Sequence, residues 1–335
     1  MKGLYSDRIV WVDWAKTVCM FLVILGHCHI NESDGFVTQY IYSFHMMFFF
    51  FLSGILCKSD LSILSLKRDV CFIILPYFTY GIVQIAFGFL CSRSFDIIDL
   101  VLQIKALIVG DSISIGPIWF LPALFICKQS FLIIKKVKVY SSHLYWLFFV
   151  LSFLPAFLIS KNNLNIPLFA DSALFGLPFF FVGNESHIIL DKIRLLKWHK
   201  CVIISIIMLF FSLCLCKYNG FVSLAGCLIG HSFWAYYIGA FAAIIAVTIM
   251  CMLLDIVQLP IVTIMSYGTI VTLGMHGIPL TLFNYYIPIL WGSEPSTYSV
   301  YLAFFYSMIT YCICYILIIV LDKHCPTLFG LKGYI

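Results

Sequence analysis

Ionisable residues lie inside the first apolar stretch of the chain. Burying their charges there costs free energy, so each is a candidate functional residue. The stretch from Trp11 to His27 contains Asp13, Lys16 and His27. Charged side chains within a membrane are rare and usually functional. Lys16 and His27 are eleven residues apart, close to three helical turns. They are therefore expected on one helix face, about 16 Å apart along the axis. Asp13 lies on the same face and is expected to neutralise Lys16; alternatively, Lys16 only extends its ammonium group to the lipid headgroups.

A second histidine lies in the next apolar stretch, which runs from Tyr42 to Gly54. His45 is followed there by a run of phenylalanines and then by Ser53-Gly54. Small residues of this kind let transmembrane helices approach closely. Histidine can move protons near neutral pH, so His27 and His45 are candidate acid–base groups. The alternative for each is a histidine whose ring is satisfied within the helix bundle or at its edge.

The elements that must position these residues are transmembrane helices. Of the 335 residues, 63% are hydrophobic and 10% are charged, whereas soluble domains carry about 25% charged residues. Several apolar stretches reach the roughly 20 residues that a membrane-spanning helix needs. We predict an all-α integral membrane protein, one domain over residues 1–335. About ten spans are expected, at 10–30, 38–57, 70–91, 117–134, 144–160, 172–190, 201–216 (short), 231–254, 261–290 and 299–320.

Three further segments carry specific expectations. The ninth span contains Pro279 and Pro288 and is expected to break there. Segment 221–229 is a candidate re-entrant loop, and 95–109 is a candidate amphipathic helix at the membrane surface. Lysine and arginine favour the cytoplasmic side. Fourteen of them lie on the side of both termini and four on the other side, so both termini are predicted to be cytoplasmic.

Cysteine and charge patterns exclude other functions. The 14 cysteines are scattered through apolar stretches and behave as small hydrophobic residues. His27 and His29 are two residues apart, a spacing that separates ligands around a helix, so no metal is expected. The net charge of +5 follows from the loop lysines and arginines, and no nucleic-acid partner is expected.

Together, the motifs of the first two spans resemble the membrane acyltransferase family 3. They are Lys16 followed by Gly-His27, and the run Phe-His45-Met-x-Phe-Phe-Phe-Phe-Leu-Ser-Gly54. The segment Asp-Trp-Ala-Lys16 is most similar to the fucose 4-O-acetylase-like branch. Later pieces also fit: Gly-Pro-Ile-Trp119-Phe-Leu entering the fourth span, and Ser-Tyr-Gly-Thr with His276 in the ninth. The chain departs from the pattern at Lys16, where many relatives have arginine, and at Met47, where many have proline.

The resemblance implies transfer of an acyl group, usually acetyl, from cytoplasmic acyl-coenzyme A to a hydroxyl of a surface polysaccharide, an O-antigen or a lipid-linked glycan. It makes His27 the general base and Lys16 the residue that holds the donor's phosphates or pantetheine arm. His45 would support His27 or polarise the thioester. Asp13, Trp119 and His276 are possible supporting residues; Trp119 is otherwise expected to be an aromatic anchor at the membrane interface.

Two alternatives have other functions. A transporter or flippase for lipid-linked glycans would share the composition and span number. However, the chain has no visible inverted repeat and only three glutamates, although proton-coupled carriers commonly use acidic relays. A non-catalytic membrane partner of a glycan-assembly complex is the other alternative. An insertion-competent His27→Ala variant that lost function would favour catalysis over scaffolding.

Overall fold

The computed structural model describes residues 8–28, 30–31, 34–92, 96–110, 116–162, 164, 166–290 and 297–334. Helices account for the regular structure in these ranges, and only two isolated β-bridges occur there. The longer helices are α2 (Val10–His27), α3 (Gly35–Ile55), α5 (Leu75–Ser92), α8 (Phe120–Tyr140), α11 (Ala170–Glu185), α13 (Trp198–Asn219), α14 (Phe233–Leu253) and α19 (Val300–His324). The shorter ones are α4 (Ile63–Asp69), α6 (Ile97–Val109), α9 (Ser142–Leu151), α10 (Phe153–Asn162), α12 (His187–Arg194), α15 (Pro260–Tyr267), α16 (Thr269–Met275), α17 (Gly277–Thr281) and α18 (Ile287–Leu290).

The helix lengths confirm a polytopic all-α membrane protein. Within the described residues, eight helical segments are long and apolar enough to cross a membrane, and two bent helix pairs raise the number to ten. The first two predicted spans correspond to α2 and α3. The seventh was predicted to be short, but α13 has 22 residues, so that expectation is wrong.

Two spans are bent. In the sixth, α11 and α12 meet at an angle of 56°. In the ninth, a 65° bend separates α15 from the helices that follow Gly268, so the main break precedes both prolines. Pro279 explains a smaller interruption: it cannot donate a hydrogen bond to the carbonyl of Met275, where α16 ends. A π-helical turn, Leu282–Tyr286, precedes Pro288.

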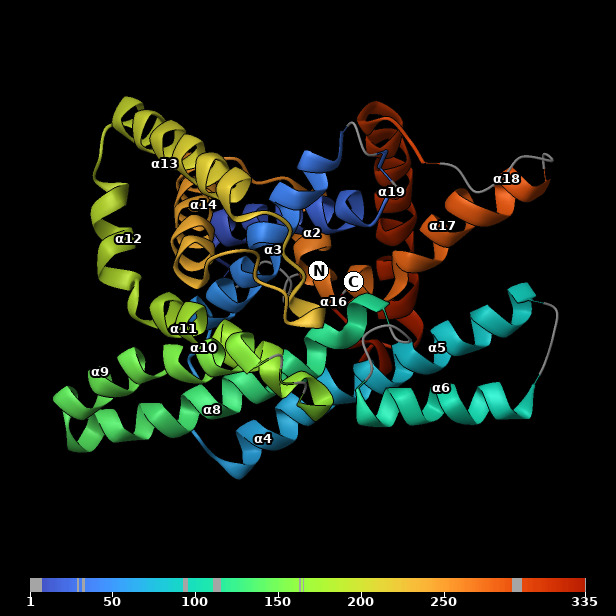
Figure 1. Cartoon of the computed structure of the whole chain (residues 1–335), viewed down its shortest axis with the longest axis horizontal. Helices are drawn as coiled ribbons and strands as arrows, with labels where there is room; N and C mark the ends of the chain where they lie inside the picture. Colours follow the sequence, from blue (N-terminus) through green and yellow to red (C-terminus); the bar gives the residue numbers. More distant parts are fainter. Residues whose placement is uncertain are drawn as a thin grey trace.

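The first two helices lie at the centre of the bundle, crossed by elements from the rest of the chain (Figure 1). Within an apolar 18-residue stretch of each helix, side chains are buried at 56% of the positions in α2 and α3 and at 61% in α14, but at only 22% in α13 and α19. The inner helices thus carry the core, and the outer ones leave most of their apolar side chains at least partly exposed. In a membrane protein such side chains can face lipid. α6 forms over the segment predicted as an amphipathic helix and lies beside α5 (Figure 1).

The predicted close approach at Ser53-Gly54 occurs between α3 and α11. A Cβ atom at Gly54 would lie 2.1 Å from the carbonyl oxygen of Phe180, and one at Gly183 would lie 2.1 Å from that of Phe51. The amide of Asn184 then donates hydrogen bonds to the carbonyls of Gly54 and Cys57, both at 3.0 Å. These contacts hold the end of α3 against α11.

Candidate active site

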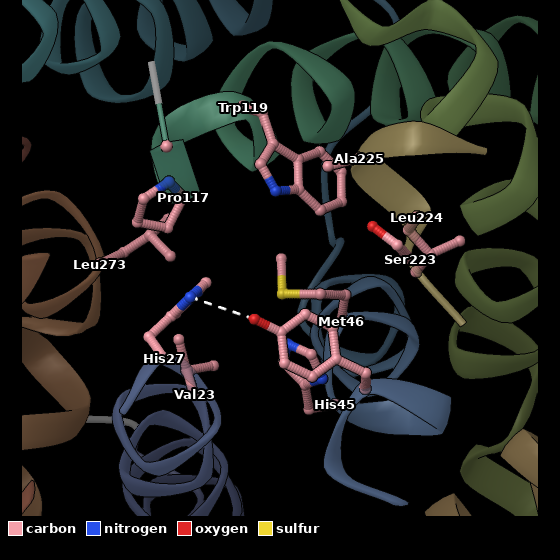
Figure 2. A pocket seen from close by; sticks show the side chains of 12 residues that line it. Val23, His27, His45, Met46, Pro117, Trp119, Ser223, Leu224, Ala225 and Leu273 are labelled. Atoms are coloured by element: carbon pink, nitrogen blue, oxygen red, sulfur yellow. Dashed lines mark hydrogen bonds between the residues drawn. The ribbon is translucent and has the colours of Figure 1, made fainter. Parts of the chain in front are cut away.

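A cavity of about 170 Å³ brings together residues from five parts of the chain. We call it the histidine cavity. Its wall includes His27 of α2, Tyr42 and His45 of α3, Trp119, and the loop that contains Ser223 (Figure 2). The structure therefore places both predicted catalytic histidines on one cavity, although they come from different helices.

Tyr42 holds the ring of His27. Its hydroxyl lies 3.1 Å from Nδ1 of His27, the contact marked in Figure 2. The Tyr42 ring also packs edge-on against His45, with ring centroids 5.2 Å apart. Tyr42 is three residues before His45, so both occupy the same face of α3. A tyrosine hydroxyl can accept a hydrogen bond from Nδ1–H, and in that tautomer Nε2 of His27 is the basic nitrogen.

Backbone hydrogen bonds define the tautomers of the other two histidines. Nδ1 of His45 lies 2.6 Å from the carbonyl of Ile41, and Nδ1 of His276 lies 2.8 Å from that of Thr272. A carbonyl only accepts hydrogen bonds, so each neutral ring carries its proton on Nδ1 and its lone pair on Nε2. His45 is thus a second potential base on the cavity.

His276 lies behind His27. It is fully buried and does not line the histidine cavity, and its ring centroid is 5.2 Å from that of His27. Within the described residues, its Nε2 has no hydrogen-bond partner. A buried polar atom without a partner is costly. The arrangement suits a group that supports His27 better than one that contacts substrate.

Trp119 is not the interfacial anchor that the sequence suggested. An anchor in the headgroup layer must be exposed to lipid, but Trp119 is only 7% exposed and faces the histidine cavity. It belongs to the 3₁₀ turn Gly116–Trp119 that leads into α8. Its indole therefore forms an aromatic wall beside the histidines, and the anchor prediction is wrong for this residue.

The candidate re-entrant segment 221–229 contributes another wall, with Ala225 beside Trp119 (Figure 2). A β-bridge joins Ser223 to Leu228, and the carbonyl of Leu224 accepts a hydrogen bond from the hydroxyl of Ser172 at 2.9 Å. The side chain of Asn219 closes the base of the loop by donating to Ile229 at 2.6 Å and accepting from Ser232 at 2.8 Å. The loop is thereby folded back onto the bundle and lines the cavity.

A larger cavity of about 490 Å³ lies against the other ends of the same helices. We call it the basic cavity. Its cationic lining residues are Lys16, Lys58, Arg68, Lys128 and Lys332, and its acidic lining residue is Asp69. The cavity thus has a strong excess of positive charge.

Only part of this charge is neutralised by neighbouring acids. Lys128 pairs with Asp69 at 2.6 Å, and Arg68 lies 3.9 Å from the same carboxylate. No carboxylate in the described part of the chain lies within 4.0 Å of Lys16, Lys58 or Lys332. Cations that line a cavity without an acidic partner are available to an anionic ligand.

Asp13 does not form the predicted pair with Lys16. Its carboxylate accepts hydrogen bonds from Arg8 at 2.7 and 2.5 Å and from the hydroxyl of Ser266 at 2.6 Å. Arg8 provides a bidentate fork, which suits a carboxylate better than a single ammonium group. The prediction is therefore corrected: Asp13 fixes the start of α2 to the end of α15, and Lys16 extends into the basic cavity.

The two cavities lie end to end along shared helices. α2 places Lys16 in the basic cavity and His27 in the histidine cavity. α3 runs the other way, with His45 in the histidine cavity and Ser53 in the basic cavity. The predicted spacing of about 16 Å between Lys16 and His27 applies, since α2 is continuous from Val10 to His27.

Several lining residues were not singled out from the sequence. Tyr42 could have been found from its position three residues before His45. Lys128 also carried a signal, because a cation within a predicted span is a functional candidate. Lys58, Arg68 and Lys332 looked like ordinary loop charges, and only the fold brings them beside Lys16. His29 lies outside the described residues.

Comparison with known families identifies the chain. The family model described as an acyltransferase domain, Acyl_transf_3, matches residues 9–319. The chain belongs to the membrane acyltransferase family 3. Nearly the whole chain is covered, including all lining residues of the histidine cavity and those of the basic cavity up to Leu273. The match favours an acyltransferase over the transporter and scaffold alternatives. No curated protein and no solved structure gave a significant match.

Proposed function

We propose that this membrane acyltransferase moves an acyl group, most readily acetyl, from acyl-coenzyme A to a sugar hydroxyl. The acceptor would be a surface polysaccharide, an O-antigen or a lipid-linked glycan, as in the fucose 4-O-acetylase-like branch that the Asp13-Trp-Ala-Lys16 segment resembles. One observation carries the proposal: a cationic cavity and a histidine cavity adjoin along the same stretch of α2, about three turns long. Acyl transfer from a phosphorylated carrier needs both kinds of site.

The basic cavity is the proposed donor site. Acyl-coenzyme A carries several phosphates, which suit lysine and arginine. Lys16, Lys58 and Lys332 have no described carboxylate within 4.0 Å of their ammonium groups. With the phosphates held there, the pantetheine arm would extend along α2 toward His27. The axial offset of about 16 Å is comparable to the length of that arm.

The histidine cavity is the proposed site of chemistry. Nε2 of His27 removes the proton from the acceptor hydroxyl as the oxygen attacks the thioester carbonyl. A new C–O bond forms, and the carbonyl π electrons move onto its oxygen. When this tetrahedral intermediate collapses, the C–S bond breaks and the proton held by His27 passes to the departing thiolate. The products are the ester and free coenzyme A.

His45 and Tyr42 would assist this reaction. The Tyr42 oxygen accepts a hydrogen bond from Nδ1–H of His27 and so keeps the lone pair of Nε2 free for the acceptor. Because its Nδ1 is already bonded to Ile41, His45 presents the lone pair of Nε2 and could support His27 as a second proton acceptor. Trp119 provides an apolar face against which a sugar ring can pack.

A direct transfer is favoured over one through an acylated cysteine. Cys57 lines the basic cavity just beyond the end of α3. Burial raises the pKa of its thiol, so the group is protonated near neutral pH. The thiolate is the nucleophilic form of cysteine, and a protonated thiol is a poor acceptor for an acyl group.

In the proposed orientation, the protein lies in a bacterial-type inner membrane and both of its termini are in the cytoplasm. This orientation rests on the excess of lysine and arginine on the side of the termini. Two of the residues counted, Lys2 and Arg93, lie outside the described residues. In this orientation the basic cavity opens toward cytoplasmic coenzyme A, because Lys58, Arg68 and Lys332 lie beyond the cytoplasmic ends of their spans. The histidine cavity would then lie nearer the outer face.

Mass spectrometry of the host's surface glycans would test this function. We expect an acyl group on a sugar hydroxyl in cells that carry the gene, its loss on deletion, and its return with the wild-type gene but not with a His27→Gln variant. Expression and membrane insertion of the variant serve as the control. Unchanged glycans after deletion, in cells shown to express the protein beforehand, would contradict the proposal.

A further inference from the structure

One side chain, that of Leu273, stands between the two cavities. Leu273 belongs to α16, is 4% exposed, and is the residue common to the linings of the basic and histidine cavities. Figure 2 shows it at the edge of the histidine cavity, on the same side as His27. One turn earlier on α16, Thr269 lines only the basic cavity. The boundary between the cavities therefore lies at position 273.

The backbone at this boundary is fixed by tight packing. A Cβ atom at the next residue, Gly274, would lie 2.3 Å from the ring of Tyr80 in α5. The backbone carbonyl of Gly274 also accepts a hydrogen bond from the side-chain amide of Gln84 at 3.0 Å. α16 is thus held against α5 without space between them. Because the helix is fixed, a smaller side chain at 273 would open the boundary between the cavities, whereas the leucine side chain occupies it.

This geometry bears on the donor. If the phosphates are bound among the cations near Lys16, the acyl group must pass the boundary before its carbonyl reaches His27. A short acyl group needs little space, whereas each added methylene must pass or remain beside Leu273. A pocket that excludes one methylene changes kcat/KM by about ten- to two-hundredfold.

We propose that Leu273 is the specificity-determining residue for acyl-chain length, limiting the group that passes from the basic cavity to the histidine cavity. The inference rests on the proposed function, because it assigns the donor to the basic cavity. It adds a residue that touches neither the coenzyme A phosphates nor the acceptor hydroxyl. Replacing Leu273 with a smaller residue widens the connection and should admit longer acyl groups.

The experiment compares acetyl-, butyryl- and hexanoyl-coenzyme A as donors for purified full-length protein. Membranes from a host that lacks the gene provide the acceptor, and mass spectrometry measures the acylated glycan. We expect Leu273→Ala to raise the ratio of kcat/KM for butyryl over acetyl by about tenfold or more. Leu273→Val, which removes less volume, should shift the ratio less and in the same direction. If the alanine variant does not fold, the valine variant tests the proposal in its place.

Matched controls are available on either side of the boundary. Leu121 lines only the basic cavity and Leu224 only the histidine cavity; both are buried, at 1% and 4% exposure. Leu→Ala at either position creates a similar defect away from the boundary, and should leave the butyryl-to-acetyl ratio within about threefold of the wild-type value.

The outcomes separate this inference from the function on which it rests. Wild-type protein that transfers acetyl, with Leu273→Ala and Leu273→Val ratios equal to the wild-type ratio, overturns the role of Leu273 and leaves the acyltransferase proposal intact. An equal shift in the Leu121→Ala variant would also overturn it, because the effect would not be specific to the boundary. Wild-type protein that transfers no acyl group from any of the three donors contradicts the proposed function itself.

Discussion

Replacing Lys16 by alanine should weaken donor binding while the fold is retained. Lys16 is half-buried in the wall of the basic cavity, and no carboxylate of the described residues lies within 4.0 Å of its ammonium group. Its removal therefore breaks no ion pair in the free protein, and the loss should appear mainly when an anion binds. A hydrogen bond to a charged group contributes about 1.5–3 kcal/mol, which corresponds to roughly ten- to a hundredfold in affinity.

A charge-conserving variant separates the charge of Lys16 from its shape. Lys16→Arg keeps the cation, and many relatives are expected to carry arginine there, so its donor affinity should stay within about threefold of wild type. Lys136→Ala is the matched control for removal of a lysine: Lys136 is exposed and does not line the basic cavity. Its loss should have almost no effect near 0.15 M salt, where distant surface charges are screened.

Isothermal titration of each purified variant with coenzyme A is the assay. The reasoning predicts an ordered series, with wild type and Lys136→Ala alike, Lys16→Arg close to them, and Lys16→Ala ten- to a hundredfold weaker. Equal affinities in Lys16→Ala and wild type would remove Lys16 from the donor site. An equal loss in Lys136→Ala would show a nonspecific effect of net charge, which would refute the specific assignment.

Three other predictions follow from the same geometry. Tyr42→Phe removes the hydrogen bond to Nδ1 of His27 and should lower kcat by about two- to tenfold with unchanged coenzyme A affinity; an unchanged kcat would exclude the positioning role. Gly54→Ala should destabilise the protein by about 1–3 kcal/mol, measured as a lower unfolding temperature in detergent, because its Cβ would meet the carbonyl of Phe180; wild-type stability would show that the helices can separate at low cost. In a variant without native reactive thiols, a cysteine at position 136 should react with an impermeant reagent only after the membrane is opened; strong labelling from outside would reverse the proposed orientation.

The parts of the site that sequence analysis could predict are those fixed by local helix geometry. The spacing of Lys16 and His27 determines that they share a face, because a continuous helix repeats every 3.6 residues. The cost of ionisable groups in a membrane identified both residues as functional candidates. The same reasoning placed His45 in a helix that packs closely through Gly54, and the structure confirms that close approach.

What could not be predicted depends on contacts between distant segments. Asp13 had two cations within reach on its own segment, Lys16 and Arg8. The choice of Arg8 depends on Ser266, which lies 253 residues away and contacts both members of the pair. Lys332 is likewise brought to the basic cavity only by the packing of the C-terminal segment, where Tyr80 donates a hydrogen bond to the carbonyl of Phe329.

The break in the ninth span was misplaced for a related reason. Proline is the strongest local signal for a helix break, so the sequence favoured positions 279 and 288. The main bend instead follows Tyr267, whose hydroxyl binds the carboxylate of Asp322 and accepts a hydrogen bond from the backbone of Lys332. These tertiary contacts hold the end of α15, and Gly268 then redirects the chain. A single-sequence pattern contains no information about such partners.

The central claim is that His27 is the catalytic base, and one paired measurement tests it most directly. Acyl transfer from acetyl-coenzyme A to host glycan is measured with purified wild-type and His27→Gln protein, and coenzyme A affinity is measured in parallel. Glutamine keeps a polar side chain but has no titratable nitrogen, so the rate should fall by about 10²–10⁴. Donor affinity should be nearly unchanged, because the phosphates would be bound about 16 Å away among the cations near Lys16. Turnover near the wild-type value in His27→Gln would contradict the account and make His45 the candidate base.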